Sequence, residues 1–291
     1  MAHNSPSHRF GQIIGELFEK AITDFLRQIA FKNSLYFDYK HPRKARSGKV
    51  DVVWEDAQGN PHKLDVVMEK NGSDDVFGEP CAFIEIAWRS YKRYSKNKVQ
   101  EISGAILPVV AKYKNCSPFY GAILSGVFTE SAIKQLESQG FAVVYIQRGT
   151  IEEAFMSVGI DSFWHENADA EVLQTKVNAY DKLTQAEKNK IQEELLGLSH
   201  KELESFERKL CNWHNRKIKC IKVMPVFGNQ SLFLCVKQAC DYILNYEENS
   251  SDTIFTRFEI KIEYTNGDKI EAEFVDRGTA VQFIETCLGV Q

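Results

Sequence analysis

The chain has 291 residues, 43% of them hydrophobic and 26% charged, with a formal net charge of −4. This composition supports a buried core and excludes a uniformly basic coat for nucleic acid, while leaving room for a local basic groove. No apolar run approaches the length of a membrane span, and the N-terminus lacks the apolar core of a secretion signal. With seven scattered cysteines, these features predict a cytoplasmic protein without a membrane segment.

The first half of the chain alternates between helical and strand patterns. Apolar residues at helical spacing predict an amphipathic helix over residues 10–31. Two β-rich segments lie within 49–70 around a turn at AQGNP. The later elements expected in this half are a strand at 81–88, a helix at 95–113, a strand at 118–128, a helix at 129–140 and a strand at 141–147. The last three indicate a parallel βαβ unit.

The second half is richer in Glu, Lys, Gln and Leu, and the change near residue 165 predicts two domains, 1–165 and 166–291. The expected elements of the second part are helices within 166–210, a helix at 231–246, a hairpin within 255–274 and a helix at 278–289. Asn266-Gly267 is a strong signal for the hairpin turn. No internal repeat is evident. The fold class expected from the whole pattern is α/β, with a mostly helical C-terminal region that carries a β-hairpin.

Two acids stand on consecutive strands of the first half. Asp65 lies in HKLDVVMEK, and Glu85 lies in the apolar run CAFIEIAW. Sequential strands usually neighbour each other, so the two carboxylates can lie close together. They repel at that distance unless a divalent cation lies between them, and Mg²⁺ prefers such oxygen ligands. Asp51, on the preceding strand, is a further candidate metal ligand.

Cations follow Glu85 without an intervening acid until Glu101. Helix faces usually alternate in charge sign, whereas this run interleaves cations with tyrosines, which suits contact with a phosphate backbone. A second basic segment, YKHPRKARSGK, lies at 39–49. The residues expected to contact DNA are Lys44, Arg46, Lys49, Arg93, Lys96 and Gln100.

The segment AFIEIAWRSYKRYSKNKVQEISGAILP, after the LDVVMEK strand, resembles a group of restriction-endonuclease-like proteins in the PD-(D/E)XK nuclease superfamily. The resemblance covers roughly residues 45–110. It implies a restriction-endonuclease-like core of a helix, a three-stranded meander, a helix, a strand, a helix and a strand. It also implies that Asp65 and Glu85 bind Mg²⁺, with Mn²⁺ as a substitute. Some members add a carboxylate from the first helix, where Glu16 and Glu19 are candidates.

One position departs from the superfamily pattern. The motif places a lysine two residues after the glutamate, and this chain has Ala87 there. In relatives with this departure, the cation can move to a nearby helix. Lys98, Arg89 and Lys92 are the candidates to replace it, with Lys96 as a further option. A lysine could orient the attacking water, and either cation could stabilise the charge of the transition state.

The resemblance therefore implies a Mg²⁺-dependent endonuclease that hydrolyses double-stranded DNA, either a type II restriction enzyme or a related anti-phage defence nuclease. Cutting both strands needs two active sites, so a homodimer is expected. A cognate methyltransferase or another defence-system protein is a further expected partner. Two alternatives stay open: a nuclease of repair or recombination, and an inactive DNA-binding or interaction module on the same fold.

Each candidate also has an ordinary structural interpretation. Asp51 and Asp65 could be exposed strand residues, and Glu85 could form a structural ion pair with Arg89. The basic segments could be solvated surface. Unpaired thiols are favoured over zinc for the C-terminal cysteines and histidine, namely Cys211, His214, Cys220 and Cys235. A cationic patch there could contact DNA or simply be solvated; its members are Arg208, Lys209, Arg216, Lys217, Lys219 and Lys222.

Overall fold

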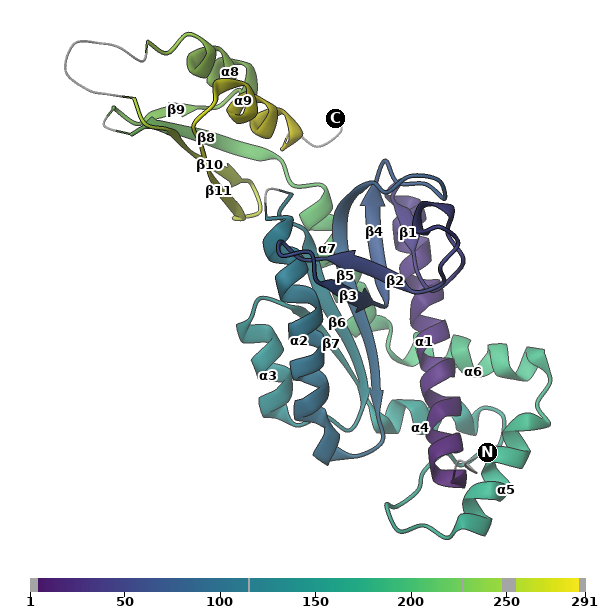
Figure 1. Cartoon of the computed structure of the whole chain (residues 1–291). Coiled ribbons are helices and arrows are strands. Elements are labelled where there is room, and N and C mark those ends of the chain that lie inside the picture. Colours follow the sequence, from purple (N-terminus) through teal and green to yellow (C-terminus); the bar gives the residue numbers. More distant parts are fainter. Residues whose placement is uncertain (1–4, 115, 227, 248–254, 288–291) are drawn as a thin grey trace. The chain divides into compact units, whose positions relative to one another are not determined.

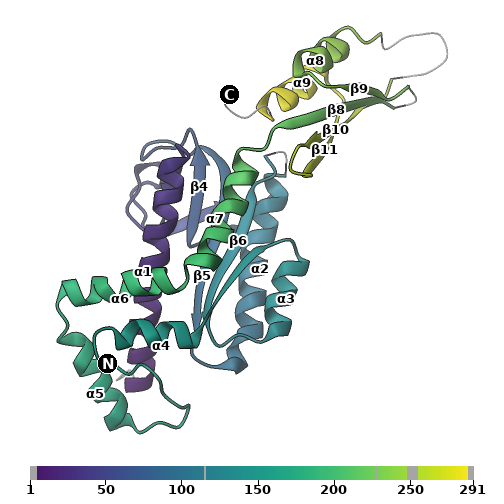
Figure 2. The same cartoon turned by 180° about the vertical axis from the view of Figure 1, so that it is seen from behind.

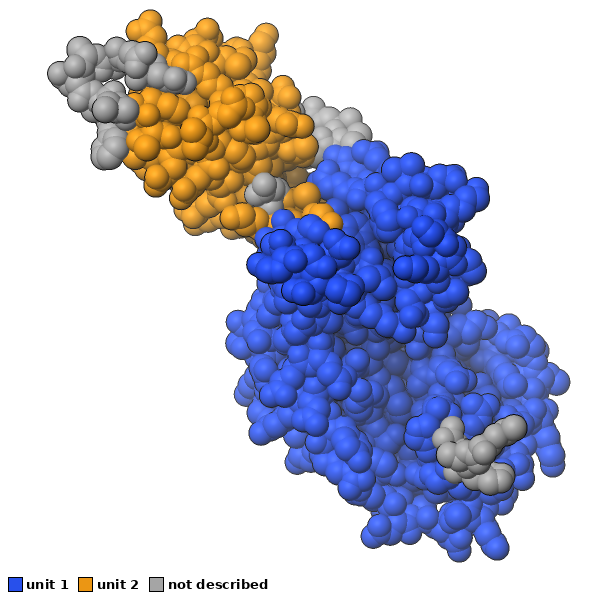
Figure 3. Space-filling view, in the orientation of Figure 1, with its two compact units in different colours: residues 1–112, 120–209 blue, residues 113–119, 210–291 orange. Residues whose placement is uncertain are grey.

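The computed structural model describes residues 5–114, 116–226, 228–247 and 255–287 and shows a mixed α/β protein (Figure 1). The chain forms two compact units (Figure 3). Unit 1 comprises residues 1–112 and 120–209, and unit 2 comprises 113–119 and 210–291. These differ from the predicted domains 1–165 and 166–291. The reason is that the helices after residue 165 pack against the first helix of the chain, which places them in unit 1.

Unit 1 contains a central sheet and the helices around it. Its helices are α1 (Pro6–Lys32), α2 (Ser95–Lys112), α3 (Glu130–Ser138), α4 (Arg148–Met156), α5 (Ala170–Asp181), α6 (Gln185–Leu198) and most of α7 (His200–His214), with short 3₁₀ helices η1 (Lys44–Arg46) and η2 (Lys92–Tyr94). Its strands are β1 (Tyr36–Asp38), β2 (Val52–Glu55), β3 (Pro61–Leu64), β4 (Val66–Lys70), β5 (Glu79–Arg89), β6 (Phe119–Gly126) and β7 (Ala142–Gln147).

The central sheet has the strand order β1-β4-β5-β6-β7. Helices α2 and α3 lie over one face, and α1 and α7 lie over the other (Figures 1 and 2). Strands β6 and β7 are parallel and flank α3, which confirms the predicted βαβ unit. Thr129 caps α3 as expected, because its hydroxyl accepts a hydrogen bond from the Ala132 N–H at 3.1 Å.

The expected three-stranded meander differs in its first strand. Strands β2 and β3 pair with each other in a separate two-stranded sheet, from Val52 opposite Leu64 to Glu55 opposite Pro61. The chain bends at Asp65 and then enters the central sheet as β4. The partner of β4 on the outer side is β1, a short strand that the sequence pattern did not indicate.

Unit 2 contains a four-stranded sheet with the order β11-β10-β8-β9. Its elements are β8 (Ile218–Pro225), β9 (Ser231–Phe233), α8 (Val236–Leu244), β10 (Phe258–Tyr264), β11 (Lys269–Phe274) and α9 (Arg277–Thr286). The hairpin at Asn266-Gly267 is confirmed, with Gly267 at φ +92°. The single helix predicted at 231–246 is wrong in its first part, which forms β9, and β8 was not predicted.

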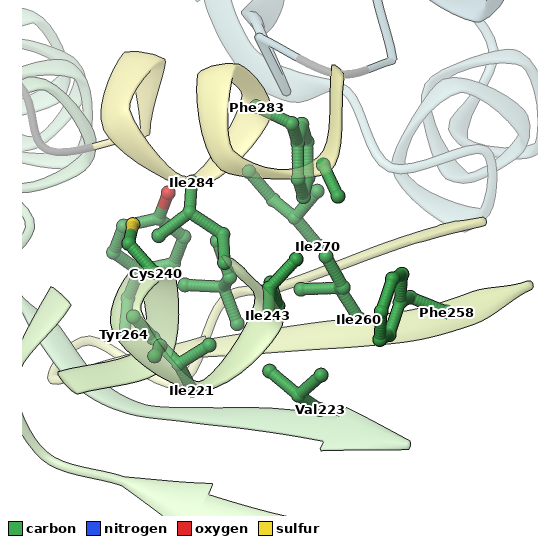
Figure 4. Close-up of a cluster of buried hydrophobic side chains, with 13 residues drawn as sticks. Ile221, Val223, Cys240, Ile243, Phe258, Ile260, Tyr264, Ile270, Phe283 and Ile284 are labelled. Atoms are coloured by element: carbon green, nitrogen blue, oxygen red, sulfur yellow. The ribbon is translucent and has the colours of Figure 1, made fainter. Parts of the chain in front are cut away.

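The order strand, strand, helix occurs twice in unit 2, as β8-β9-α8 and β10-β11-α9. The first strands of the two halves pair antiparallel at the centre of the sheet. The halves also share positions: Ala239 and Ile243 lie four and eight residues after the N-cap of α8, as Ala280 and Ile284 do in α9. All four pack in one core between the helices and the sheet (Figure 4). Unit 2 therefore contains an internal structural repeat of two strand-strand-helix halves.

A fully buried ion network fixes the loop between β1 and β2 to the central sheet. The Arg43 guanidinium donates to Asp38 Oδ2 at 2.8 Å and makes two bonds to the Glu69 carboxylate, at 2.5 and 3.0 Å. It also donates to the backbone carbonyls of Ser73 and Val76. All three charged side chains are 0% exposed. Charge-assisted bonds of this density compensate the cost of burying the charges.

Arg46 belongs to the same network, which corrects the expectation that it contacts DNA. Its guanidinium forms an ion pair with Asp38 and donates to the carbonyl of His41 at 2.7 Å. The Arg46 side chain is only 4% exposed. A guanidinium engaged in this way cannot also reach a phosphate outside the protein.

We predict that Arg43→Ala lowers the free energy of unfolding by about 3–5 kcal/mol, because it leaves Asp38 and Glu69 buried without their shared cation. Denaturant unfolding followed by circular dichroism measures the change. The matched control is Lys44→Ala, whose side chain is 73% exposed and pairs only with surface acids. We expect the control to leave stability nearly unchanged, because exposed ion pairs contribute little. Equal effects of the two substitutions would contradict a stabilising role for the network.

Candidate active site

Strand β5 carries Glu85 into the interior of unit 1. The strand lies between β4 and β6, and every residue from Cys81 to Ala87 is buried. Strands covered on both faces read as continuous apolar runs, which explains the sequence of this segment. Glu85 is 4% exposed within it. A carboxylate in such a place costs free energy unless a cation or hydrogen-bond donors compensate it.

Asp65 lies beside Glu85 and is held there by backbone bonds. The Asp65 N–H donates to Glu85 Oε1 at 3.2 Å, and Asp65 Oδ2 accepts from the Ile86 N–H at 2.9 Å. These reciprocal bonds lock the bend between β3 and β4 against β5. The structure thus brings together the two acids that the sequence placed on neighbouring strands, with Asp65 at the bend before β4 and not inside a strand.

The pKa of Glu85 is raised well above its ordinary value. Burial of the carboxyl group is the largest cause, and the negative charge of Asp65 adds to it. The positive charge of Lys98 lowers the pKa and only partly opposes these effects. Because burial and Asp65 outweigh Lys98, an additional cation next to Glu85 would stabilise its charged form.

Helix α2 supplies the cation closest to Glu85 among the three candidates. Lys98 Nζ lies 3.8 Å from Glu85 Oε2 and 3.7 Å from Glu101 Oε2, and its side chain is 19% exposed. Arg89 instead donates to its neighbouring Trp88 carbonyl at 2.8 Å and pairs with Glu101 at 3.6 Å. Lys92 lies on η2 with an exposed side chain. The structure therefore favours Lys98 as the partner of Glu85.

Ala87 lies two residues after Glu85 on the same strand and is 3% exposed. Alternation along the strand places its side chain on the face of Glu85. Lys98 reaches Glu85 from a different element, the helix that follows β5. A cation is thus present beside the glutamate although position 87 is alanine.

A pocket lined by several charged residues opens next to Asp65. Its lining comes from α1, the residues after β1, the start of β2, the end of β3 with the bend at Asp65, and β5: Glu19, Thr23, Tyr39, Lys40, Asp51, Val52, Lys63, Leu64, Asp65 and Ile86. Three acids and two lysines are among them, a set that could hold a metal-bound phosphate. Lys63 was not expected at the site, and Lys40 was expected only as part of the basic segment 39–49. Lys63 stands two residues before Asp65, a spacing that could have indicated it.

The acids of the pocket differ in their environment. Asp51 forms an ion pair with Lys63 at 2.9 Å, and the hydrogen bond from Lys63 lowers the pKa of Asp51. Glu19 is exposed as a whole residue, but partial burial of its carboxyl group and then the charge of Asp65 raise its pKa. Glu16 is exposed and lies 3.9 Å from Arg9. The charge of Asp51 is therefore balanced by Lys63, whereas Glu19 is repelled by the negative charge of Asp65.

The donor chemistry of Asp65 and Glu85 fits a divalent cation such as Mg²⁺. Both are hard oxygen ligands, and Mg²⁺ commonly takes one or two carboxylates while it keeps several waters. No group of three or more His, Cys, Asp or Glu residues that could hold a metal occurs in the described part of the chain. This observation covers zinc as well, so Cys211, His214, Cys220 and Cys235 do not form such a group.

The residues predicted to contact DNA occupy different environments. Lys49, Lys96 and Gln100 are exposed. Lys44 is exposed but pairs with Asp75 at 3.1 Å. Arg93 pairs with Glu166 at 2.8 Å and stacks over the Tyr94 ring at 4.8 Å. The exposed residues near the start of α2 are therefore the best placed for a phosphate backbone.

In the C-terminal cationic patch, the side chain of Arg216 is engaged in contacts within the protein. It is 8% exposed, pairs with Asp268 at 3.2 Å and stacks on the rings of Trp213 and Tyr264. Lys222 pairs with Glu263 at 2.8 Å. These contacts lie within unit 2 and give both residues a structural role.

Comparison with known proteins gives little guidance. No protein-family model and no curated protein matches the chain. One crystal structure, of a protein described as of unknown function, aligns with 67% of this chain and 97% of its own, at 15% identity and a TM-score of 0.29. A similarity this weak carries no argument about function. Among the described residues, no helix has the length and apolar character needed to cross a membrane.

We predict that Glu85→Gln is more stable than the wild type at neutral pH in EDTA. The folded-state pKa of Glu85 is raised, so the folded chain binds its proton more tightly than the unfolded chain. The stability from this group is therefore present at acid pH and is lost as pH rises through the raised pKa. Denaturant unfolding of both proteins between acid and neutral pH measures the difference. Glu101→Gln, which changes an acid that is 61% exposed, is the control and should leave the pH dependence unchanged.

Proposed function

We propose that the chain is a Mg²⁺-dependent nuclease that hydrolyses phosphodiester bonds of double-stranded DNA at Asp65 and Glu85. The observation that supports the proposal is a contrast between two buried glutamates of the central sheet. Glu69 is saturated by Arg43 and by the Gly78 N–H at 2.6 Å. Glu85 has a second acid as its neighbour and Lys98 as its cation at 3.8 Å. A carboxylate left in this state has capacity for a further cation.

Each residue then has a distinct task. A divalent cation bound by Asp65 and Glu85 would neutralise both carboxylates and provide Lewis-acid chemistry at the scissile phosphate. Lys98 holds its positive charge next to Glu85, where it can orient water or stabilise charge that develops on the phosphate. The backbone bonds between Asp65 and β5 hold the acids in position, so little reorganisation is needed when substrate binds.

The start of α2 is the proposed contact with the DNA backbone. Lys92 on the preceding η2 and Lys96 and Gln100 on α2 are exposed, in the same segment as Lys98. Arg93 would contribute after release from its surface pair with Glu166. Lys49 and Lys44 offer a second contact from the loop between β1 and β2. Because such contacts read the backbone and not the bases, they position DNA without defining a target sequence.

The restriction or anti-phage role, the homodimer that cuts both strands and a cognate methyltransferase follow only from the sequence resemblance. They remain part of the proposal as its biological setting. Cleavage of a mixed DNA pool at one fixed sequence would support a restriction enzyme. Cleavage directed by structure or by DNA ends would instead favour the repair or recombination alternative.

A second candidate function is an inactive DNA-binding or interaction module on the same fold. Ala87 favours it, because the position that carries the motif lysine in the superfamily is a small apolar residue here. The two candidates agree on binding and differ on cleavage, so a single activity measurement separates them.

We predict that the purified chain cuts plasmid DNA with Mg²⁺ and not in EDTA, and that Asp65→Asn and Glu85→Gln abolish cutting. Lys98→Ala should lower the cleavage rate by about 10²–10³, the typical effect of removing one group that stabilises the transition state. Gel quantification of nicked and linear plasmid gives the rates. Lys112→Ala, at the far end of the same helix, is the matched control and should cut at the wild-type rate.

Metal binding has an independent readout. Mg²⁺ should raise the unfolding midpoint of the wild type and leave that of Glu85→Gln unchanged, because a ligand that binds only the folded state stabilises it. A chain that binds DNA and Mg²⁺ but cuts no substrate would favour the inactive module. A chain whose cleavage survives Glu85→Gln would exclude this site as the catalytic centre.

We further predict that Lys92→Ala/Lys96→Ala weakens DNA binding in a salt-dependent way. Each lost phosphate contact should reduce the slope of log K against log salt by about 0.9, so the double variant should lose about two units. Fluorescence anisotropy with a labelled duplex in EDTA, over a series of salt concentrations, measures both slopes. The control is Lys134→Ala, which removes a lysine of α3 whose side chain is 67% exposed. An unchanged slope in the double variant would show that α2 does not contact the DNA backbone.

A further inference from the structure

The two edges of the unit 2 sheet have different chemistry. The outer strand β11 carries Lys269, Glu271 and Glu273 as exposed residues. At the other edge, β9 spans Ser231–Phe233 without a charged residue, and Leu234 and Cys235 follow it. Charges on an edge strand oppose pairing with another chain, whereas an uncharged edge offers free backbone groups. The β9 edge is therefore the one suited to strand addition.

Leu232 and Leu234 make this edge apolar as well as uncharged. They are 54% and 74% exposed, which is a large apolar area for one residue inside a short strand and one just after it. Leu232 is paired with Lys222 of β8 and so lies on the face of the sheet away from α8 and α9. Phe233, between the leucines, points to the other face, where its ring lies 5.2 Å from that of Tyr242 in α8. Leu232 thus lies on the open face, and Leu234 follows the last residue of the strand in an exposed bend.

The rest of the open face neutralises its own charges. Lys222 pairs with Glu263 at 2.8 Å, and Lys261 forms an ion pair with Glu271. Arg257 pairs with Glu259 at 3.0 Å and with Glu273 at 3.1 Å. Balanced pairs of this kind leave no net positive field for a phosphate backbone. The apolar corner at β9 is the unbalanced part of the face, which argues for a protein partner over nucleic acid.

We propose that β9 pairs antiparallel with β9 of a second copy of the chain and joins two four-stranded sheets into one continuous sheet. The pairing extends β9 by one residue, to Leu234, and its register centres on Phe233, so Leu232 of each copy lies opposite Leu234 of the other. Directly opposed side chains in an antiparallel pair lie on the same face. All four leucines then gather on the open face and cover one another.

Self-complementarity identifies a second copy as the occupant. A two-fold interface brings the same patch of both subunits together, so the patch must be chemically compatible with itself. Two uncharged leucines spaced two residues apart meet this condition, since each finds an equal partner across the axis. Unit 2 already uses the same pairing at its centre, where the first strands of its two halves run antiparallel.

The test is the mass of the full-length chain in solution without DNA, which makes it independent of the nuclease proposal. Sedimentation equilibrium should show the wild type as a dimer of the 33.3 kDa chain. Leu232→Lys/Leu234→Lys should raise the dissociation constant at least about 100-fold, because the substituted lysines of the two copies face one another. Circular dichroism checks that this variant stays folded, as expected for exposed positions.

The matched control is Val275→Lys. Val275 is 73% exposed and precedes the N-cap of α9, as Leu234 precedes the N-cap of α8. It lies next to the charged edge, so the control should remain dimeric. A wild type that stays monomeric at all concentrations, or a control that dissociates as readily as the double variant, would overturn the proposal.

Cysteine crosslinking tests the register. In a Cys235→Ser background, Leu232→Cys/Leu234→Cys should give a disulfide-linked dimer on a non-reducing gel after mild oxidation. Leu232→Cys alone should crosslink at least about ten-fold less, since it faces Leu234 of the other copy. Equal crosslinking by the single variant would contradict the register centred on Phe233.

Discussion

The buried carboxylate of Glu85 is the constraint around which unit 1 is organised. It stands in the middle of a strand that is covered on both faces, where a charge is costly. Two kinds of contact offset this cost. The Asp65 N–H donates to Glu85, the Ile86 N–H donates to the Asp65 carboxylate, and Lys98 lies beside Glu85 from the helix that follows. These contacts compensate Glu85 only in part, because Asp65 is itself an acid and its charge raises the pKa of Glu85. The incomplete compensation would be the physical basis for the metal-dependent site that we propose.

The same sheet contains a buried acid that is fully compensated. Strand β4 begins after Asp65 and ends near Glu69, so it joins the two kinds of site within a few residues. At Glu69, Arg43 makes a two-point contact and also binds Asp38. This end of the strand is closed to solvent and serves stability. The end at Asp65 borders a pocket with lysines in its wall. Acids meet at both ends, and the two ends differ in solvent access and in the number of cations.

Unit 2 shows how an edge can be protected or left open within one sheet. Its two strand-strand-helix halves share buried positions such as Ala239 and Ala280, so one core serves both. Their outer strands have diverged, with charges on β11 and leucines on β9. A repeat normally presents two similar edges. The uncharged β9 favours a partner at that edge, where Leu232 is exposed on the open face.

The sequence by itself determined the α/β class, the βαβ unit around Thr129, the hairpin at Asn266-Gly267 and the proximity of Asp65 and Glu85. These rest on local signals: helix caps, turn residues, and an acid inside an apolar run. Only the tertiary structure decided that β2 leaves the central sheet, that Arg46 is buried and that Lys98, and not Arg89, accompanies Glu85. Each of these depends on contacts between segments far apart in the chain, which a local pattern does not encode. The boundary between the units follows the same rule, because the packing of α5 and α6 on α1 places them in unit 1.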